Sequence, residues 1–106
     1  MIETCGLRER SPDFWRELRA TYLGMLMRVD HQLGLVIDAL RESGHYDQTA
    51  IFVFSDHGDF TGDFGCVEKA QTTLYDCLTR VPLVIKPPGG VTARAGVRGQ
   101  LVELID

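Results

Sequence analysis

The stretch that decides the fold is Ala50-Ile51-Phe52-Val53-Phe54-Ser55-Asp56-His57-Gly58, in which an apolar run ends abruptly in polar residues. Residues 50–54 are all apolar and rich in β-branched and aromatic side chains, which predicts a strand covered on both faces. Such strands are typical of parallel sheets, and these sheets bind ligands beyond the carboxyl ends of their strands. We therefore expect the chemistry of this chain at Asp56 and His57.

The segments on either side of this stretch predict a helix before it and a second strand after it. Residues 11–43 carry apolar side chains at three- and four-residue steps, with Ser11 as the expected N-cap and Gly44 as the expected stop. A second apolar run, residues 81–86, ends in prolines and glycines that cannot continue a strand. Residues 100–105 resemble the start of another helix. This order of elements predicts an α/β fold.

Composition narrows the classes of function. The 106 residues suffice for one small domain, and the net charge of −4 argues against nucleic acid or an anionic membrane surface as a partner. No apolar run reaches the roughly 18 residues that a membrane span needs. Cys5, Cys66 and Cys77 show no paired spacing, which predicts free thiols, as in a reducing compartment, rather than a zinc site or a disulfide framework.

The loop after the predicted strand combines the residue types that hold a cation. Asp56 and His57 can offer one oxygen and one nitrogen, and Gly58 lets the backbone fold closely around the site. Calcium and magnesium prefer oxygen ligands, whereas manganese and zinc accept imidazole well. Two alternatives stay open here: His57 could serve an anionic substrate as a proton donor, or the loop could be a plain polar turn.

A wider set of motifs resembles the sulfatase family, which belongs to the alkaline-phosphatase-like superfamily. The resemblance covers about residues 20–106, in order and with compatible spacing. The segments that carry it are Arg28-Val29-Asp30, Leu33-Gly34, Ser55-Asp56-His57-Gly58, Gly62-Asp63-Phe64-Gly65, Lys69, Arg80-Val81-Pro82-Leu83, residues 84–90 and residues 101–106. The resemblance implies that residues 1–106 are the C-terminal portion of a catalytic domain. It also implies a partial alkaline-phosphatase-like sandwich with a mostly parallel sheet flanked by helices.

The resemblance also implies roles for individual residues in sulfate ester hydrolysis. Asp56 and His57 match ligands of the divalent cation, which is usually calcium in sulfatases, with magnesium and manganese left open. Lys69 matches the catalytic, substrate-binding lysine that contacts the sulfate group, a role that suits a compact positive charge. Asp59 and Asp63 are expected to support the site or to be solvated rather than to bind the metal.

Two departures from the family pattern matter. Many relatives carry a second histidine where this chain has Phe64. Sulfatases carry their nucleophile on Cys-x-Pro-Ser-Arg or Cys-x-Ala-Ser-Arg, whose cysteine becomes formylglycine, and none of the three cysteines here matches that motif. The resemblance therefore implies that the formylglycine, together with the earlier paired aspartates of the cation shell, lies upstream of Met1. The chain alone is expected to be inactive.

Three hypotheses for function remain at this point. The first is a fragment of a metal-dependent sulfuric ester hydrolase, whose partner is the N-terminal part of the domain or a second copy. The second is a phosphodiester or phosphonate monoester hydrolase of the same superfamily. The third is a non-enzymatic α/β module that docks onto another polypeptide through an apolar face.

Overall fold

The long amphipathic pattern forms helix α1, Pro12–Glu42, in the computed structural model, which describes residues 7, 9–69, 73–92, 94–99 and 102–103. Ser11 caps α1, since its hydroxyl oxygen accepts a hydrogen bond from the Phe14 backbone N–H at 3.3 Å. Beyond the helix, Gly44 has a φ of 72°, the left-handed conformation that commonly ends helices. The predicted cap and stop of this helix are therefore confirmed.

The strands form two separate antiparallel pairs. The predicted strand after α1 is β1, Ile51–Phe54, and it pairs with β4, Leu83–Lys86, with Ile51 opposite Lys86 and Phe54 opposite Leu83. A second pair, formed by β2 (Phe60–Thr61) and β3 (Val67–Glu68), follows β1 in the chain and was not predicted by sequence analysis. The remaining elements are short: η1 Tyr46–Gln48, β2 Phe60–Thr61, η2 Asp63–Gly65, β3 Val67–Glu68 and α2 Asp76–Thr79.

The α/β class is confirmed, but the prediction of a mostly parallel sheet is not. Both strand pairs in the described part of the chain run antiparallel. The reason is that an unbroken apolar run indicates coverage on both faces of a strand and carries no information about the direction of its neighbour. The helix predicted at residues 100–105 falls largely outside the described residues.

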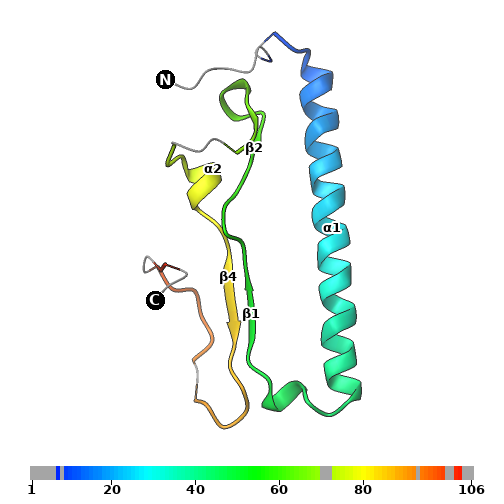
Figure 1. Ribbon diagram of the computed structural model, residues 1–106, viewed down its shortest axis with the longest axis vertical. Coiled ribbons are helices and arrows are strands. Elements are labelled where there is room, and N and C mark those ends of the chain that lie inside the picture. The colour runs from blue at the N-terminus through cyan, green and yellow to red at the C-terminus, as the bar shows by residue number, and fades with distance from the viewer. Residues whose placement is uncertain (1–6, 8, 70–72, 93, 100–101, 104–106) are drawn as a thin grey trace.

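Helix α1 runs along one side of the two strand pairs and is linked to β1 through η1 (Figure 1). Near its N-terminal end, the Arg19 Nε donates a hydrogen bond to the Thr61 carbonyl oxygen at 3.0 Å, which ties α1 to β2. The small core of the described residues is formed where β2, β3 and α2 meet. It consists of Phe60 in β2, Cys66 just before β3 and Leu78 in α2, which are 2%, 3% and 5% exposed. None of the described helices is long and apolar enough to traverse a lipid bilayer.

Lys86 ties the other end of α1 to the sheet. Its ammonium group donates hydrogen bonds to the carbonyl oxygens of Tyr46 and Thr49, the latter at 3.0 Å. It also lies 4.3 Å from the centroid of the Tyr46 ring, within range of a cation–π interaction. One side chain of β4 therefore fixes the turn through which the chain passes from α1 into β1.

Candidate active site

The loop that leaves β1 is held by three short hydrogen bonds. The Ser55 hydroxyl donates to the His57 carbonyl oxygen at 2.6 Å, and the His57 backbone N–H donates to Asp56 Oδ1 at 3.0 Å. The Gly58 N–H donates to the Leu78 carbonyl oxygen at 2.7 Å, which joins the loop to the end of α2. The two predicted ligand residues therefore stand on a loop that is closed by its own hydrogen bonds and is joined to α2 at Gly58.

Gly58 is required at its position by close packing. A Cβ atom built on Gly58 would lie 2.0 Å from the Cys77 carbonyl oxygen and 3.0 Å from the Cys77 carbonyl carbon. Both atoms belong to the backbone and cannot move aside as a flexible side chain could. The absence of a side chain at Gly58 thus lets the loop approach α2 closely, next to the core residue Leu78.

The two ring nitrogens of His57 face partners of opposite kinds. Its Nε2 lies 3.1 Å from the Lys69 ammonium nitrogen, and its Nδ1 lies 2.8 Å from the Gly58 carbonyl oxygen. An ammonium group can only donate and a carbonyl can only accept, so one tautomer of the neutral imidazole satisfies both contacts. In this tautomer Nδ1–H donates to Gly58, and Nε2 presents its lone pair. A metal-ligating histidine commonly has its other nitrogen hydrogen-bonded in this way.

The Asp56 carboxylate lies beside the same nitrogen. Its Oδ2 is 3.7 Å from His57 Nε2, and the two side chains are 75% and 35% exposed. Lys69 reaches them from the end of β3, where Glu68 takes a φ of 64° and turns the chain. The structure therefore brings together all three residues that the resemblance singled out, with an oxygen and a nitrogen donor beside one positive charge and open to solvent.

This donor set fits part of a metal site. An aspartate oxygen and a neutral histidine nitrogen are ligands that divalent cations accept. Within the described residues, no group of three or more His, Cys, Asp or Glu side chains could hold a metal ion. Calcium takes about six to eight oxygen ligands, so Asp56 and His57 would supply only a share of its shell. The rest of the shell would need further oxygen ligands, such as carboxylates, backbone carbonyls or water.

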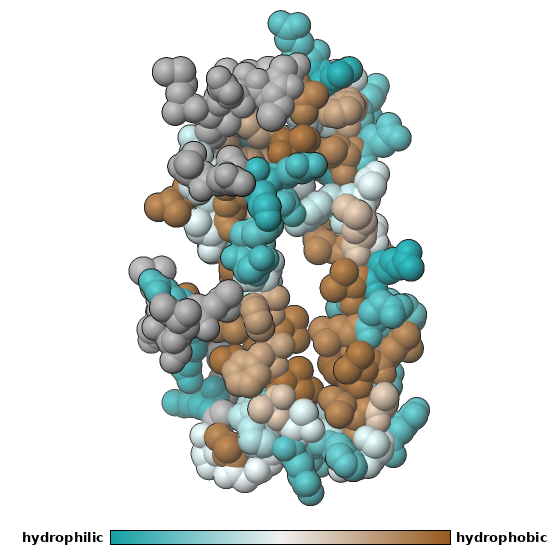
Figure 2. Space-filling view, in the orientation of Figure 1, coloured by the Kyte–Doolittle hydropathy of each residue, from teal (hydrophilic) through white to brown (hydrophobic). Residues whose placement is uncertain are grey.

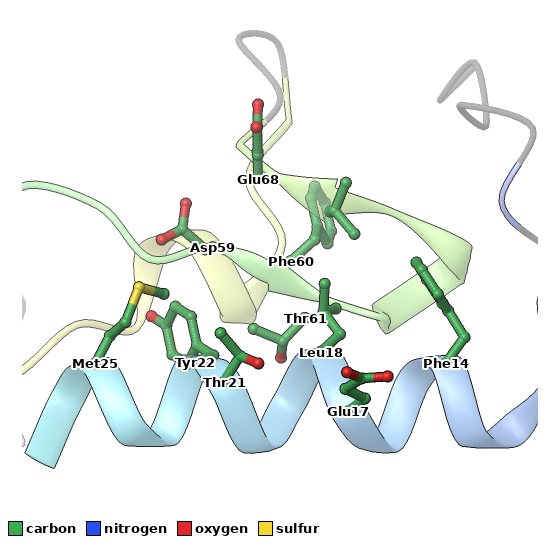
Figure 3. A pocket seen from close by; sticks show the side chains of 11 residues that line it. Phe14, Glu17, Leu18, Thr21, Tyr22, Met25, Asp59, Phe60, Thr61 and Glu68 are labelled. Atoms are coloured by element: carbon green, nitrogen blue, oxygen red, sulfur yellow. The ribbon is translucent and has the colours of Figure 1, made fainter.

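The other acidic residues of the loop do not join this pair. Asp63 Oδ2 accepts a hydrogen bond from the Thr61 backbone N–H at 3.2 Å, which is a supporting role within the loop. Asp59 lines a groove next to α1 (Figure 3). Phe64, at the position of the family's second histidine, packs against Tyr75 with a centroid distance of 4.5 Å.

Sequence reasoning missed the groove itself, which lies between α1 and the β2–β3 pair and has a volume of about 450 Å³ (Figure 3). Its walls are largely apolar, and none of the described residues that line it is a lysine or an arginine. The lining residues are Phe14, Glu17, Leu18, Thr21, Tyr22, Met25, Asp59, Phe60, Thr61, Val67 and Glu68. The only signal in the sequence was the alternation of apolar residues at positions 60 and 67 with polar neighbours, which is too short to interpret.

The thiols near the site are free in the described residues, as predicted for two of the three cysteines. Cys66 is buried in the core and Cys77 is half-buried, while Cys5 lies outside the described residues. Removal from water raises the pKa of the Cys77 thiol, and the nearby negative charge of Asp63 raises it further. Cys77 is therefore a protonated, packing thiol at neutral pH and has no features of an activated nucleophile.

Comparisons with known proteins identify the family of the chain. The family described as Sulfatase matches residues 3–106. The multifunctional alkaline phosphatase superfamily protein PehA of Trinickia caryophylli is 40% identical over 74 residues, which are 70% of this chain and 14% of that protein. An arylsulfatase of Clostridium perfringens is 33% identical over 93 residues, covering 86% of this chain and 19% of the relative.

The iduronate 2-sulfatase of Homo sapiens is 35% identical over 94 residues, which are 89% of this chain and 17% of that protein. The chain thus spans less than a fifth of the length of these relatives. No solved structure matches it significantly. The family match extends over nearly the whole sequence and includes the loop with Asp56, His57 and Lys69. On this evidence, the chain belongs to the sulfatase family.

Proposed function

We propose that this chain forms part of the active site of a metal-dependent sulfuric ester hydrolase, as the C-terminal portion, residues 1–106, of its catalytic domain. The substrate would be a sulfate ester. The observation that carries the proposal is the convergence of three side chains: Asp56 Oδ2 lies 3.7 Å, and Lys69 Nζ lies 3.1 Å, from His57 Nε2. Family membership supports the same reading.

Each of the three residues has a distinct role in this proposal. Asp56 and His57 would hold a divalent cation, calcium by family resemblance and magnesium or manganese as alternatives. When bound, the cation would supply positive charge that stabilises negative charge on the transferring group. Lys69 would bind a sulfate oxygen as a second positive charge. The hydrogen bond from His57 Nδ1 to Gly58 would keep the lone pair of Nε2 available, and the cation would take the place that the Lys69 ammonium holds beside this nitrogen.

The nucleophile and the remaining cation ligands would come from other parts of the catalytic domain. By resemblance, that nucleophile is a formylglycine, and the other ligands are aspartates. The same parts would add the parallel strands that complete the alkaline-phosphatase-like sandwich. The proposal therefore assigns binding and charge stabilisation to this chain, and it predicts no turnover of a chromogenic sulfate ester by the 106 residues alone.

A second candidate is hydrolysis of a phosphodiester or phosphonate monoester. One observation favours it: the 40% identical relative PehA is described as a multifunctional member of the alkaline phosphatase superfamily. A cation beside Lys69 would attract a phosphoryl group as well as a sulfuryl group, since both present tetrahedral anionic oxygens. The nucleophile and the walls of the complete pocket would decide between the two substrates.

The metal half of the proposal is tested by titrating the chain with calcium and with manganese in a calorimeter. The wild-type chain is expected to bind weakly, with a dissociation constant on the order of a millimolar, since two protein ligands are far fewer than the six to eight that calcium prefers. Asp56→Ala should abolish the heat of binding. Asp30→Ala is the matched control, because Asp30 is an exposed aspartate of α1 outside the site. If the Asp56 variant binds the metal ion with the same heat and affinity as the wild type, the proposal is wrong.

A further inference from the structure

The ammonium group of Lys69 lies at the nitrogen lone pair that His57 would offer to a cation. Lys69 Nζ is 3.1 Å from His57 Nε2, while Nδ1 of the same ring is 2.8 Å from the Gly58 carbonyl oxygen. A neutral imidazole has one nitrogen that can accept, and an ammonium group can only donate. Nε2 can therefore accept a hydrogen bond from Lys69 or bind a metal ion, and it cannot do both at once.

The backbone brings Lys69 to this position. Glu68, the last residue of β3, pairs with Phe60 of β2 and has a φ of 64°, a conformation that is uncommon for a residue with a side chain. Such conformations persist where the surrounding structure imposes them, and they cluster at functional sites. The strand pair therefore fixes where the Lys69 side chain starts, whereas its flexible four-carbon stem lets the ammonium group move.

The surroundings of this contact are polar. Asp56 Oδ2 lies 3.7 Å from His57 Nε2, so a negative and a positive group stand beside the same ring nitrogen. Hydrophilic side chains gather over the segment that joins β1 to β2 (Figure 2). Small ions in solution can therefore reach this nitrogen, and the Lys69 ammonium group can exchange its hydrogen bond for one to another acceptor.

We propose that Lys69 and the divalent cation compete for His57 Nε2, and that a sulfate group relieves the competition by accepting the hydrogen bonds of the ammonium group. This inference rests on the proposed function. It adds that the sulfate-binding lysine also sets the affinity of the site for the cation. Anion and cation then strengthen each other's binding, and linkage requires the same factor in both directions.

The charges of the site give the physical reason. While Lys69 donates to Nε2, an arriving cation lacks the imidazole ligand and meets a like charge beside Asp56. Once sulfate oxygens accept from Lys69, the lone pair of Nε2 is released, and the charge of the anion also attracts the cation. A lysine that only held the sulfate group, without the contact to His57, would leave the imidazole unchanged when the anion binds.

Calorimetric titration of the 106-residue chain with manganese chloride tests the competition. Lys69→Met removes the ammonium group and should bind manganese about threefold to tenfold more tightly than the wild type, since one exposed charge pair changes an equilibrium a few-fold and the cation carries two charges. Arg16→Met is the control for net charge, because Arg16 is 76% exposed and pairs with Asp13 within α1. Its affinity should stay within about twofold of the wild type, because salt screens exposed charges outside the site.

Methyl sulfate, the anion of a simple sulfate ester, tests the coupling when it replaces chloride at constant ionic strength. It should raise the manganese affinity of the wild type by at least about threefold and leave that of Lys69→Met unchanged. Equal manganese affinities of Lys69→Met and the wild type would overturn the proposal. An equal effect of methyl sulfate on both proteins would overturn it as well.

Nitrogen NMR of the histidine rings tests the contact without any variant. Methyl sulfate added without metal should shift the resonance of His57 Nε2, because the hydrogen bond from Lys69 is lost. His31 and His45 lie outside the site and serve as internal controls at the same pH. A His57 resonance that stays in place while methyl sulfate binds would refute the competition.

Asp56→Ala separates failure of this inference from failure of the proposed function. If Asp56→Ala loses manganese binding while Lys69→Met and the wild type bind equally, the competition is refuted and the proposed function stands. If Asp56→Ala binds manganese as the wild type does, the proposed function is refuted, and the inference that rests on it is refuted too.

Discussion

Replacing Gly58 by alanine tests how the site loop is held. The added methyl group would lie 2.0 Å from the Cys77 carbonyl oxygen and 3.4 Å from the Leu78 Cα atom. Since these are backbone atoms, the loop and α2 must separate. Separation would also stretch the hydrogen bond of 2.7 Å between the Gly58 N–H and the Leu78 carbonyl oxygen.

The size of the effect follows from these two losses. Forcing a methyl group into a filled site costs about 1–3 kcal/mol. Losing one backbone hydrogen bond adds about 0.5–1.5 kcal/mol. We therefore expect Gly58→Ala to lower the free energy of unfolding by about 2–4 kcal/mol. Backbone strain plays no part, because Gly58 is absent from the glycines with positive φ.

Gly24→Ala is the matched control within the same chain. Gly24 lies inside α1, and a Cβ atom there would have nothing within 4 Å. Alanine should therefore raise the free energy of unfolding by about 0.5–1 kcal/mol, through its better helix propensity. Urea unfolding followed by the fluorescence of Trp15 measures both, since the Trp15 ring packs beside Gly62 in the same loop. A loss of about 3 kcal/mol moves the urea midpoint by roughly 2 M. Equal midpoints for the two variants would refute the packing argument.

Two further predictions concern Lys86, which fixes the turn between α1 and β1, and the Cys77 thiol next to the site. Lys86→Met should lower the free energy of unfolding by about 1–3 kcal/mol, because the carbonyl oxygens of Tyr46 and Thr49 lose a charged donor; the urea midpoint of Lys86→Arg, which keeps the charge, should fall less. Cys77 should react slowly with iodoacetamide at neutral pH and faster as pH rises, because burial and then Asp63 raise its pKa and reduce the thiolate fraction. Mass spectrometry measures the rate at which iodoacetamide alkylates Cys77 and the rate for a cysteine in a short peptide. Equal rates at pH 7 would contradict the prediction.

The sequence predicted the elements whose signals are local. Ser11 and Gly44 define the ends of α1 through their own hydrogen bonding and backbone conformation, which neighbours in the sequence specify. The apolar run at residues 50–54 predicted β1 to within one residue. It also placed Asp56 and His57 at the end of that strand, where the structure has them. Local patterns therefore predicted the position of the candidate site.

Features that depend on distant segments could not be predicted in this way. The antiparallel pairing of β1 with β4 joins segments about 30 residues apart, and strand direction leaves no trace in an apolar run. Strands β2 and β3 have two residues each, too few for any periodicity. Gly58 was expected to give the backbone freedom around a cation, whereas in the structure it makes room for the Cys77 carbonyl group.

The apolar stripe of α1 shows how a correct local prediction can leave the partner of a helix face open. Val29 and Val36 follow the helical period, and the helix forms as predicted, yet both side chains remain more than half exposed. Periodicity specifies which face of a helix needs a partner but not which segment provides it. The proposed cation site has the same property, since Asp56 and His57 would provide only two donors of a shell that needs more. In both cases the local pattern specifies what kind of partner is needed, an apolar surface for the helix and further oxygen ligands for the proposed cation, and leaves open which residues provide it.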